Sequence, residues 1–286
     1  MRSPSAQDPG IIADPSDIER VELDLLLDAI QRLYGYDFRQ YARSTVERRL
    51  MEIRLREGFR NLSELQGTAL RDAGILNDVI SALSIQVSSL FRDAGFYLAF
   101  RRKVIPLLRT YPSIRIWHAG CATGEEVYST AILLAEEGLI TKCRLYATDL
   151  NVDALETASN GVYPKSDLVG CEGSYQQAGG SKSLADYFDI NGGAGHVRET
   201  LRERITFFQH NLVTDTSFND FHVILCRNVL IYFNKPLQDR VHELLYLSLV
   251  RFGILGLGAN ETLHLTVKEK RYRALDETAR LYRRVD

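Results

Sequence analysis

Two glycines in one short loop are the first residues of this 286-residue chain that suggest chemistry. Gly120 and Gly124 lie in the stretch Trp117–Glu126, between a β-rich run and an apolar, helix-like run. Glycine lets a backbone turn sharply and approach a ligand without a Cβ in the way. The spacing is neither the GxGxxG of dinucleotide-binding loops nor the GxxxxGK[ST] of the P-loop. The loop therefore predicts a nucleoside ligand without phosphates, bound where an open α/β sheet binds its ligands.

An acidic residue ends the next β-rich run. Asp149 comes 25 residues after Gly124, and a carboxylate at that place accepts hydrogen bonds from both ribose hydroxyls. The ordered set of strand, glycine loop, helix, strand and acid predicts an adenosine ligand, and S-adenosylmethionine fits it best. The alternative is that Asp149 only caps the helix that begins near Val152.

Three further positions are candidates for contact with a ligand or a substrate. Arg227 and Asn228 follow the strand-like run Phe221–Cys226, so they are expected at the same rim as the glycine loop. Tyr232 can place its hydroxyl or ring near a reaction centre, and the alternative is ordinary packing with a satisfied hydroxyl. Arg92, in a hinge before the α/β part, is either a surface charge or a fork that holds a carboxylate.

The elements that must position these residues change in character near residue 112. Before it, apolar spacing and breakers predict helices, the first with Val21, Leu25 and Ala29 on its apolar face; the helices span 18–33, 41–57, 62–70, 75–84 and 93–108. After it, strands and helices alternate: strands 114–117, 143–148 and 221–226 with helices 125–137, 152–159 and 236–252. Such alternation predicts an α/β fold with a doubly wound parallel sheet. The Gly- and Ser-rich segment 161–204 is predicted to be an insertion, partly loop or small β structure.

Composition excludes several classes of protein. With 35 Lys and Arg against 37 Asp and Glu, the net charge is −2, which argues against a nucleic-acid-binding protein. The four cysteines form no CxxC pair and the six histidines show no metal spacing, so neither a metal site nor a disulfide framework is expected. The chain has no apolar run long enough for membrane insertion and no secretory pattern at its N-terminus. We therefore expect a cytoplasmic protein.

One predicted helix is strongly basic. Residues 39–60 hold seven arginines and three glutamates, a local balance of +4. Val46, Leu50 and Ile53 recur at helical spacing and are expected to face inward. Without further information, the favoured interpretation is a solvent-exposed helix whose arginines form ion pairs with its glutamates.

The motifs together resemble those of the chemotaxis receptor methyltransferase (CheR) family. That family shows, in order, N-x-T-x-F-F-R-D, A-G-C-S-T-G-E-E-P-Y-S, T-D-I-D, G-x-Y-P, N-L and C-R-N-V-x-I-Y-F. The corresponding stretches here are QVSSLFRD at 86–93, AGCATGEEVYS at 119–129, TDLN at 148–151, GVYP at 161–164, NL at 211–212 and CRNVLIYF at 226–233. GANETL at 258–263 looks like the family's G-x-S-E-S-L, and the likeness covers residues 20–284. Gln86 and Ser88 replace the usual Asn and Thr but keep their hydrogen-bonding ability.

The resemblance implies S-adenosylmethionine as cofactor, S-adenosylhomocysteine as product, no metal, and glutamate side chains of a chemoreceptor as substrate. The product is a glutamyl methyl ester that tunes receptor signalling. Arg92 and Tyr232 are expected nearest the methyl transfer, as the catalytic pair. With the two glycines found above, the residues expected to border the cofactor are Gln86, Ser88, Arg92, Gly120, Gly124, Glu125, Asp149, Asn211, Leu212, Arg227 and Asn228.

The sequence patterns and the resemblance together predict the domain organisation of the chain. A disordered tail at 1–17 precedes an N-terminal helical domain at 18–90, and a Rossmann-like methyltransferase domain follows at 91–286 with a small inserted β subdomain at 161–204. The basic helix is expected to meet the acidic methylation region of the receptor through Arg43, Arg48, Arg49, Arg54 and Arg56. In some members the inserted subdomain also docks a short peptide at the receptor's C-terminus.

Two other functions stay open at this point. One is a regulatory module that binds the cofactor but no longer catalyses, against which the presence of Arg92 and Tyr232 argues. The other is a carboxyl methyltransferase for small molecules, against which the arginine-rich helical domain argues, because a small substrate needs a lid more than a charged docking surface.

Overall fold

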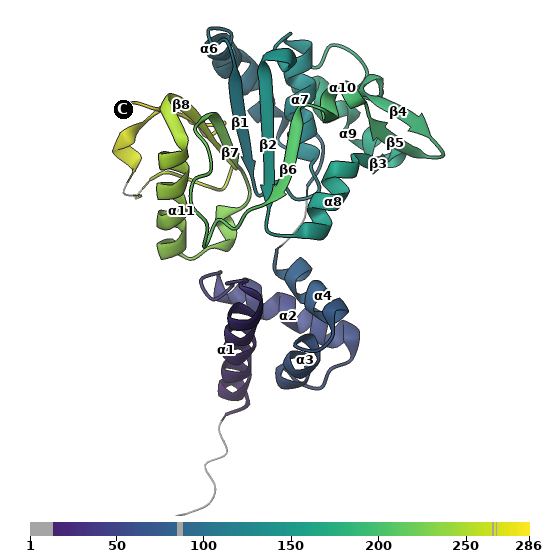
Figure 1. The fold of residues 1–286 in the computed structure, drawn as a ribbon, viewed down its shortest axis with the longest axis vertical. Helices are drawn as coiled ribbons and strands as arrows, with labels where there is room; N and C mark the ends of the chain where they lie inside the picture. The colour runs from purple at the N-terminus through teal and green to yellow at the C-terminus, as the bar shows by residue number, and fades with distance from the viewer. Residues whose placement is uncertain (1–13, 85–87, 265, 267) are drawn as a thin grey trace, which may run out of the picture. The chain divides into compact units, whose positions relative to one another are not determined.

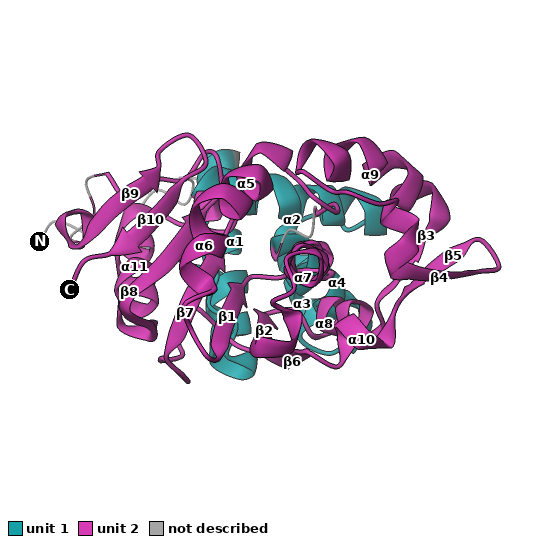
Figure 2. Cartoon of the chain, turned by 90° about the horizontal axis from the view of Figure 1, so that it is seen from above, with its two compact units in different colours: residues 1–39, 43–83 teal, residues 40–42, 84–286 magenta. Residues whose placement is uncertain are grey.

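The protein is described by a computed structural model that covers residues 14–84, 88–264, 266 and 268–286 (Figure 1). The chain forms two compact units, coloured separately in Figure 2. Unit 1 comprises residues 1–39 and 43–83, and unit 2 comprises residues 40–42 and 84–286. None of the described helices is both long and apolar enough to cross a membrane.

Unit 1 is helical. Its elements are α1 (Pro15–Tyr34), α2 (Arg43–Glu57), α3 (Leu62–Ala69) and α4 (Ala73–Leu83). Asp14 begins α1 by accepting a hydrogen bond from the Ser16 backbone N–H at 2.8 Å, so residues 15–17 are helical rather than part of a tail. The rest of the predicted tail, residues 1–13, lies outside the described residues.

The predicted apolar face of α1 was wrong. Val21 and Leu25 are 57% and 53% exposed, and Ala29 is half-buried. The buried stripe of α1 consists instead of Leu23, Leu26, Leu27 and Ile30. Both stripes have helical spacing, and the buried one follows the i, i+3, i+4, i+7 pattern that a core-facing helix prefers.

The main element of unit 2 is a seven-stranded sheet in the order β6-β2-β1-β7-β8-β10-β9. Strands β6, β2, β1, β7 and β8 pair in parallel, and β10 and β9 add antiparallel pairs at one side. The bounds are β1 (Ile114–Ala119), β2 (Cys143–Asp149), β6 (Ile205–Gln209), β7 (Phe221–Cys226), β8 (Leu249–Leu257), β9 (Tyr272–Asp276) and β10 (Leu281–Arg284).

Helices cover both faces of this sheet because alternate strand residues point to opposite sides. On one face, Ile116 and Leu225 pack with residues of α5 (Ala94–Ala99) and α7 (Glu125–Glu136). On the other face, Trp117 and Ile224 pack with α11 (Lys235–Ser248). The remaining helical elements of this part are the π-helical turn η1 (Phe100–Val104), α6 (Ile105–Leu108), η2 (Ile140–Lys142), α8 (Val152–Asn160), η4 (Leu230–Tyr232) and η5 (Glu269–Arg271). The predicted doubly wound α/β fold is confirmed.

One helix boundary differs from the sequence-based prediction. The helix predicted over 236–252 ends at Ser248, because residues 249–252 already belong to β8. No Gly or Pro separates the two elements, so the apolar pattern runs through the boundary.

The insertion contains the expected small β structure. It also contains a helix that its glycine content did not predict. A three-stranded sheet has the order β3-β5-β4, with both pairs antiparallel. Gly170 and Gly173 lie inside α9, a 13-residue helix that had been predicted as loop. The elements are β3 (Val162–Pro164), α9 (Lys165–Gln177), η3 (Leu184–Tyr187), β4 (Phe188–Asn191), β5 (Ala194–Val197) and α10 (Glu199–Arg202).

Candidate active site

Four adjacent parallel strands, β6, β2, β1 and β7, bring candidate residues to one edge of the sheet. Asn211, Asp149, Gly120 and Asn228 lie at or just beyond the carboxyl ends of these strands. Backbone hydrogen bonds join neighbouring ends: the Gly120 N–H donates to the Thr148 carbonyl at 2.8 Å. This edge is where an open α/β sheet binds its ligands. Residues from separate motifs thus lie together at this edge of the sheet.

The glycine loop needs its glycines for close packing as well as for turning. Gly120 has φ +75°, and a Cβ there would lie 2.5 Å from Cγ2 of Val229 in the turn after β7. Gly124 has φ +93° and precedes α7, and a Cβ there would lie 2.9 Å from Cβ of Ala158 in α8. The loop is therefore held against both neighbouring segments. Glu125 follows it and accepts a hydrogen bond from the Thr123 hydroxyl at 2.8 Å.

Asp149 is held at the end of β2 by two backbone donors. Its Oδ2 accepts from the Ala122 N–H at 2.9 Å, and its Oδ1 accepts from the Asn151 N–H at 3.0 Å. Burial raises the pKa of Asp149, and these backbone hydrogen bonds offset the rise only in part. Each carboxylate oxygen accepts more than one hydrogen bond, so this arrangement suits two ribose hydroxyls.

The side chain that caps α8 is that of Asn151, not Asp149. Asn151 Oδ1 accepts from the Ala154 N–H at 3.1 Å, and Asn151 is the N-cap of the helix. The alternative that Asp149 serves only as a helix cap is therefore contradicted.

A buried carboxylate that sequence reasoning missed, Glu261, holds the turn after β7. It is 3% exposed and accepts backbone hydrogen bonds of 2.6–3.0 Å from Asn228, Val229, Leu230 and Gly258. Asn228 itself adopts φ +61°, which a residue other than glycine seldom does. Burial raises the pKa of Glu261, and the four backbone donors oppose that rise. Glu261 lies in the GANETL stretch at 258–263, and the likeness of that stretch to the family motif does not predict a role for this residue.

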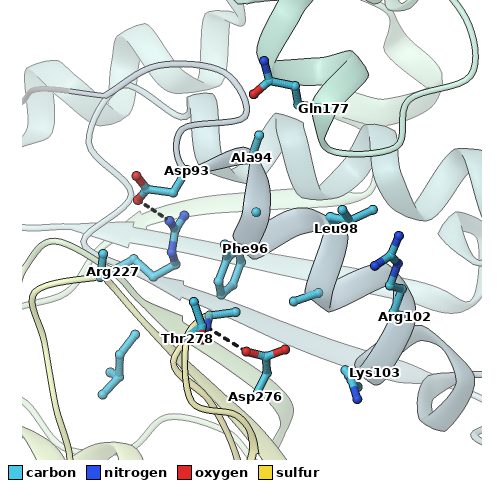
Figure 3. A pocket seen from close by; sticks show the side chains of 15 residues that line it. Asp93, Ala94, Phe96, Leu98, Arg102, Lys103, Gln177, Arg227, Asp276 and Thr278 are labelled. Carbon is cyan, nitrogen blue, oxygen red and sulfur yellow. Dashed lines mark hydrogen bonds and ion pairs between the residues drawn. The ribbon is translucent and has the colours of Figure 1, made fainter.

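Arg227 is placed differently from the expectation that its side chain borders the cofactor. Its side chain is only 2% exposed and forms ion pairs with Asp93 at 2.8 Å and Glu126 at 3.0 Å. The guanidinium carbon lies 4.0 Å from the centroid of the Phe96 ring. Figure 3 shows Arg227 turned toward Asp93 with Phe96 beside it. The side chain of Arg227 is thus engaged within the protein, and a contact of this residue with the cofactor stays a prediction.

Glu126 joins this network to the first strand. Its Oε1 lies 2.9 Å from Nδ1 of the fully buried His118. Burial acts to raise the pKa of Glu126, but the hydrogen bond with His118 and the positive charge of Arg227 outweigh it, so the pKa lies below its usual value. Neither Glu126 nor Asp93 had been singled out, because nothing in the motifs shows which way the arginine turns.

The segment that carries Arg92 is a tight turn. Phe91 and Asp93, on either side of Arg92, adopt φ of +53° and +59°. The Arg92 N–H donates to the Ser89 carbonyl at 3.3 Å. Ser88 precedes this turn and is half-buried, whereas the predicted site residue Gln86 lies outside the described residues.

The remaining predicted site residues lie in the turns that follow β6 and β7. Asn211 uses its side-chain oxygen to accept from the Val213 N–H at 2.9 Å, and Leu212 beside it is buried. Tyr232, in η4, is half-buried, and its carbonyl accepts from the Ala42 N–H at 2.7 Å. Both turns follow parallel strands, so these residues approach the same edge through their backbone.

A pocket of about 490 Å³ lies beside the Arg227 network (Figure 3). Asp93, Phe96 and Arg227 form one part of its lining. Another part is formed by Asp276, at the end of β9, and Thr278, in the turn before β10. Among the described residues, no group of three or more His, Cys, Asp or Glu side chains is placed to hold a metal ion.

The five arginines expected to dock a receptor lie on or at the start of α2, and four of them form ion pairs within unit 1. Arg43 pairs with Asp24 and Glu47, Arg48 and Arg49 both pair with Glu52, and Arg56 pairs with Glu57 and Asp78. Arg54 donates to the Arg60 carbonyl at 2.7 Å. Val46, Leu50 and Ile53 are buried, as expected. The generic description, a solvated helix with Glu–Arg pairs, fits this surface.

Comparison with known proteins identifies the family. Residues 86–279 match the family described as "CheR methyltransferase, SAM binding domain", and residues 21–84 match "CheR methyltransferase, all-alpha domain". The chain is 41% identical over 264 residues to "Putative methyltransferase Cher3" of Pseudomonas putida, covering 92% of this chain and 97% of the relative. It is 30% identical over 236 residues to "Chemotaxis protein methyltransferase" of Listeria monocytogenes, covering 82% and 87%.

These matches confirm the resemblance that the motifs indicated. The carboxylate of Asp149, which backbone donors hold beside the glycine loop at the end of β2, fits S-adenosylmethionine as the cofactor. The chain belongs to the CheR methyltransferase family and is an S-adenosylmethionine-dependent methyltransferase.

Proposed function

We propose that this enzyme transfers the methyl group of S-adenosylmethionine to glutamate side chains in the methylation region of a chemoreceptor in the cytoplasm. The products are glutamyl methyl esters, which tune receptor signalling, and S-adenosylhomocysteine. The observation that supports this best is the shared edge of β6, β2, β1 and β7, where Asp149 is oriented by backbone donors while Asn151 caps α8. The names of chemotaxis relatives support the class of substrate.

On this proposal the cofactor lies along that edge. Asp149 holds the ribose and the loop from Gly120 to Gly124 lies under the nucleoside. Glu125, Asn211 and the backbone of the turn at Asn228 border the rest of the cofactor. Gln86, Ser88, Arg92 and Leu212 complete the proposed contacts, and all four fall within the stretch 86–279 that matches the SAM binding domain.

The chemistry asks the protein mainly for alignment. The bound cofactor supplies a methyl group on a positively charged sulfur, which is already a good leaving group. A glutamate is ionised at neutral pH and attacks without a general base. Arg92 and Tyr232 orient the glutamate in line with the methyl group and exclude water from its carboxylate. An ion pair between Arg92 and that carboxylate must stay loose, because tight binding of the ground state slows the attack.

The helical unit provides the encounter with the receptor. Its stretch 39–60 has a local balance of +4, although four of the five arginines of α2 have carboxylate partners of their own. Exposed ion pairs contribute only about 0–1 kcal/mol, so acidic groups of a receptor can replace those partners. Such a surface speeds association and weakens with salt. The sheet β3-β5-β4 of the insertion is the proposed place for a receptor's C-terminal peptide.

Two measurements on the purified full chain test the proposal. Calorimetry with S-adenosylhomocysteine and with NAD should show binding of the first and not of the second. Receptor fragments that carry the methylation region should then gain methyl groups, and base treatment should release them, as expected for esters.

The outcomes separate the alternatives. Preference for NAD, or binding of neither compound, would contradict the site. Binding without methyl incorporation into receptor fragments would favour a regulatory module. Methylation of small carboxylic acids but not of the fragments would favour a small-molecule enzyme.

A further inference from the structure

The turn that carries Arg92 adopts a conformation that its residues do not favour. Phe91 and Asp93 both have φ in the left-handed region, at +53° and +59°, and neither is glycine. Left-handed backbone brings the Cβ of an ordinary residue too close to its own carbonyl. A conformation of this kind persists only where the surroundings hold it from several sides.

Phe91 is held from one side by packing and by a hydrogen bond. Its N–H donates to Oγ of Ser129 on α7 at 2.8 Å. Its fully buried ring packs against Tyr97 and Tyr175, with ring centroids 5.1 and 5.2 Å away. These contacts fix the first half of the turn to the helix layer.

Arg227 holds the second half. Its Nη2 forms an ion pair with Asp93 Oδ2 at 2.8 Å and lies 3.4 Å from the Arg92 carbonyl oxygen. Its Nη1 forms an ion pair with Oε2 of Glu126 on α7 at 3.0 Å. The ring of Phe96 covers one face of the guanidinium group. Because Arg227 directly follows β7, its side chain connects the central sheet, α7 and the Arg92 turn.

We propose that Arg227 is a positioning residue for methyl transfer: through Asp93 and Glu126 its side chain fixes the strained turn from which Arg92 reaches the reacting groups. This inference rests on the proposed function, in which Arg92 lies next to the methyl group. It assigns the arginine of the CRN motif a task distinct from holding the cofactor. This role requires the planar guanidinium group with its several N–H donors. The ammonium group of a lysine cannot donate to two carboxylates and a carbonyl in one plane.

The chain offers a matched control in Arg101. This arginine is also largely shielded from water, with 10% of its side chain exposed. It also forms ion pairs with two carboxylates, Glu136 and Glu137, and donates from Nε to the Ala178 carbonyl at 3.0 Å. It lies in the η1 turn, where no residue has a positive φ, and we have placed it in no part of the active site.

The experiment compares Arg227→Lys with Arg101→Lys in the full chain. Both changes keep the charge and remove the fork, so both should lower the melting temperature. Because a small misplacement of a reacting group slows a reaction strongly, Arg227→Lys should lower kcat about 10- to 100-fold. Its Kd for S-adenosylhomocysteine should change less than about threefold, and kcat of Arg101→Lys should stay within about twofold of the wild-type value.

Hydrogen exchange provides a readout that does not depend on activity. The N–H groups of Phe91, Arg92 and Phe96 are all hydrogen-bonded in the wild-type protein. In the ligand-free Arg227→Lys protein these amides should exchange about tenfold faster, whereas Arg101→Lys should leave them unchanged.

Three outcomes would overturn the inference. The first is a loss confined to affinity for S-adenosylhomocysteine, which would make Arg227 a cofactor ligand. The second is an equal loss of kcat in both variants, and the third is unchanged exchange at the turn. If Arg227→Lys does not fold, Asp93→Asn replaces it with the same expectations. A wild-type enzyme that fails to methylate receptor fragments would defeat the proposed function instead, and the exchange experiment would still decide whether Arg227 holds the turn.

Discussion

The arginines of α2 and Arg227 of the methyltransferase unit form similar ion pairs in opposite surroundings. On α2, the side chains of Arg48 and Glu52 are 56% and 51% exposed, and those of Arg56 and Asp78 are 57% and 46% exposed. Arg227 is 2% exposed and Glu126 is 17% exposed. Exposed pairs contribute about 0–1 kcal/mol, whereas removal of one partner from a buried pair costs about 3–5 kcal/mol.

The exposure of an ion pair decides whether its charges can change partners. Water and salt already compete with the ion pairs on α2. The arginines there can therefore exchange their carboxylate partners for those of an approaching acidic surface. The pair of Arg227 and Glu126 is largely shielded from water, so its charges stay together and hold the backbone around them.

The largest effect is expected at Asp149. Replacement by Asn removes the charge that is proposed to accept two ribose hydroxyls, so affinity for S-adenosylhomocysteine should fall about 30- to 100-fold, or about 2–3 kcal/mol. Calorimetry measures this directly. Asp153→Asn, in the first turn of α8 and exposed, is the control and should bind normally. Equal affinity of both variants would remove Asp149 from the cofactor site.

The next effect concerns the stability of the turn after β7. In Glu261→Gln, an amide NH₂ group faces backbone N–H donors, so the free energy of unfolding should fall by about 1–3 kcal/mol. Urea unfolding measures it. Glu243→Gln, at a partly exposed carboxylate paired with Lys268, should change stability by less than about 1 kcal/mol. If the two variants were equally stable, the buried carboxylate would not hold the turn.

A smaller effect is expected on the receptor surface. Reversal of Arg49 and Arg56 to Glu should raise KM for receptor fragments about tenfold at low salt and leave affinity for the cofactor unchanged. The difference should shrink as salt is added. The double reversal of Arg20 and Arg32 on α1, both more exposed, is the matched control for net charge. Unchanged receptor kinetics in the α2 variant would remove that helix from the docking surface.

The smallest effect is a pH dependence of cofactor affinity. Burial raises the pKa of Asp149 above its usual value, and only the ionised carboxylate accepts both hydroxyls. As the pH falls from 8 to 5, protonation of Asp149 should weaken binding of S-adenosylhomocysteine by about a fewfold, at a higher pH than an ordinary aspartate would. Titrations at several pH values measure it. Asp149→Asn should bind with no such slope, and a slope that survives in this variant would assign the effect to another group.

Sequence patterns predicted the residues at the strand ends better than the directions of their side chains. Strands that alternate with helices must run in parallel, so Gly120, Asp149 and Asn228 had to reach one edge. The direction of Arg227 depends on Asp93 and Glu126, which are distant in sequence, and no local pattern encodes such a choice. For the same reason, the four donors around Glu261 were not foreseen.

Helix errors have a similar origin. Two apolar stripes on α1 have helical spacing, and only packing against α3 and the rest of unit 1 decides which one is buried. The glycines of α9 suggested a loop, but the helix forms because Leu168 and Tyr175 are buried against its neighbours. Tertiary contacts override local preference in both cases.

The single tryptophan of the chain gives the molecule a built-in optical probe. Trp117 is fully buried in β1, three residues before Gly120, and its indole N–H donates to the Thr148 hydroxyl at 2.9 Å. The Thr148 carbonyl in turn accepts from the backbone of the glycine loop. Its fluorescence therefore originates from one known place beside the glycine loop, and a change in emission on addition of S-adenosylhomocysteine can report occupancy of the proposed site without any attached dye.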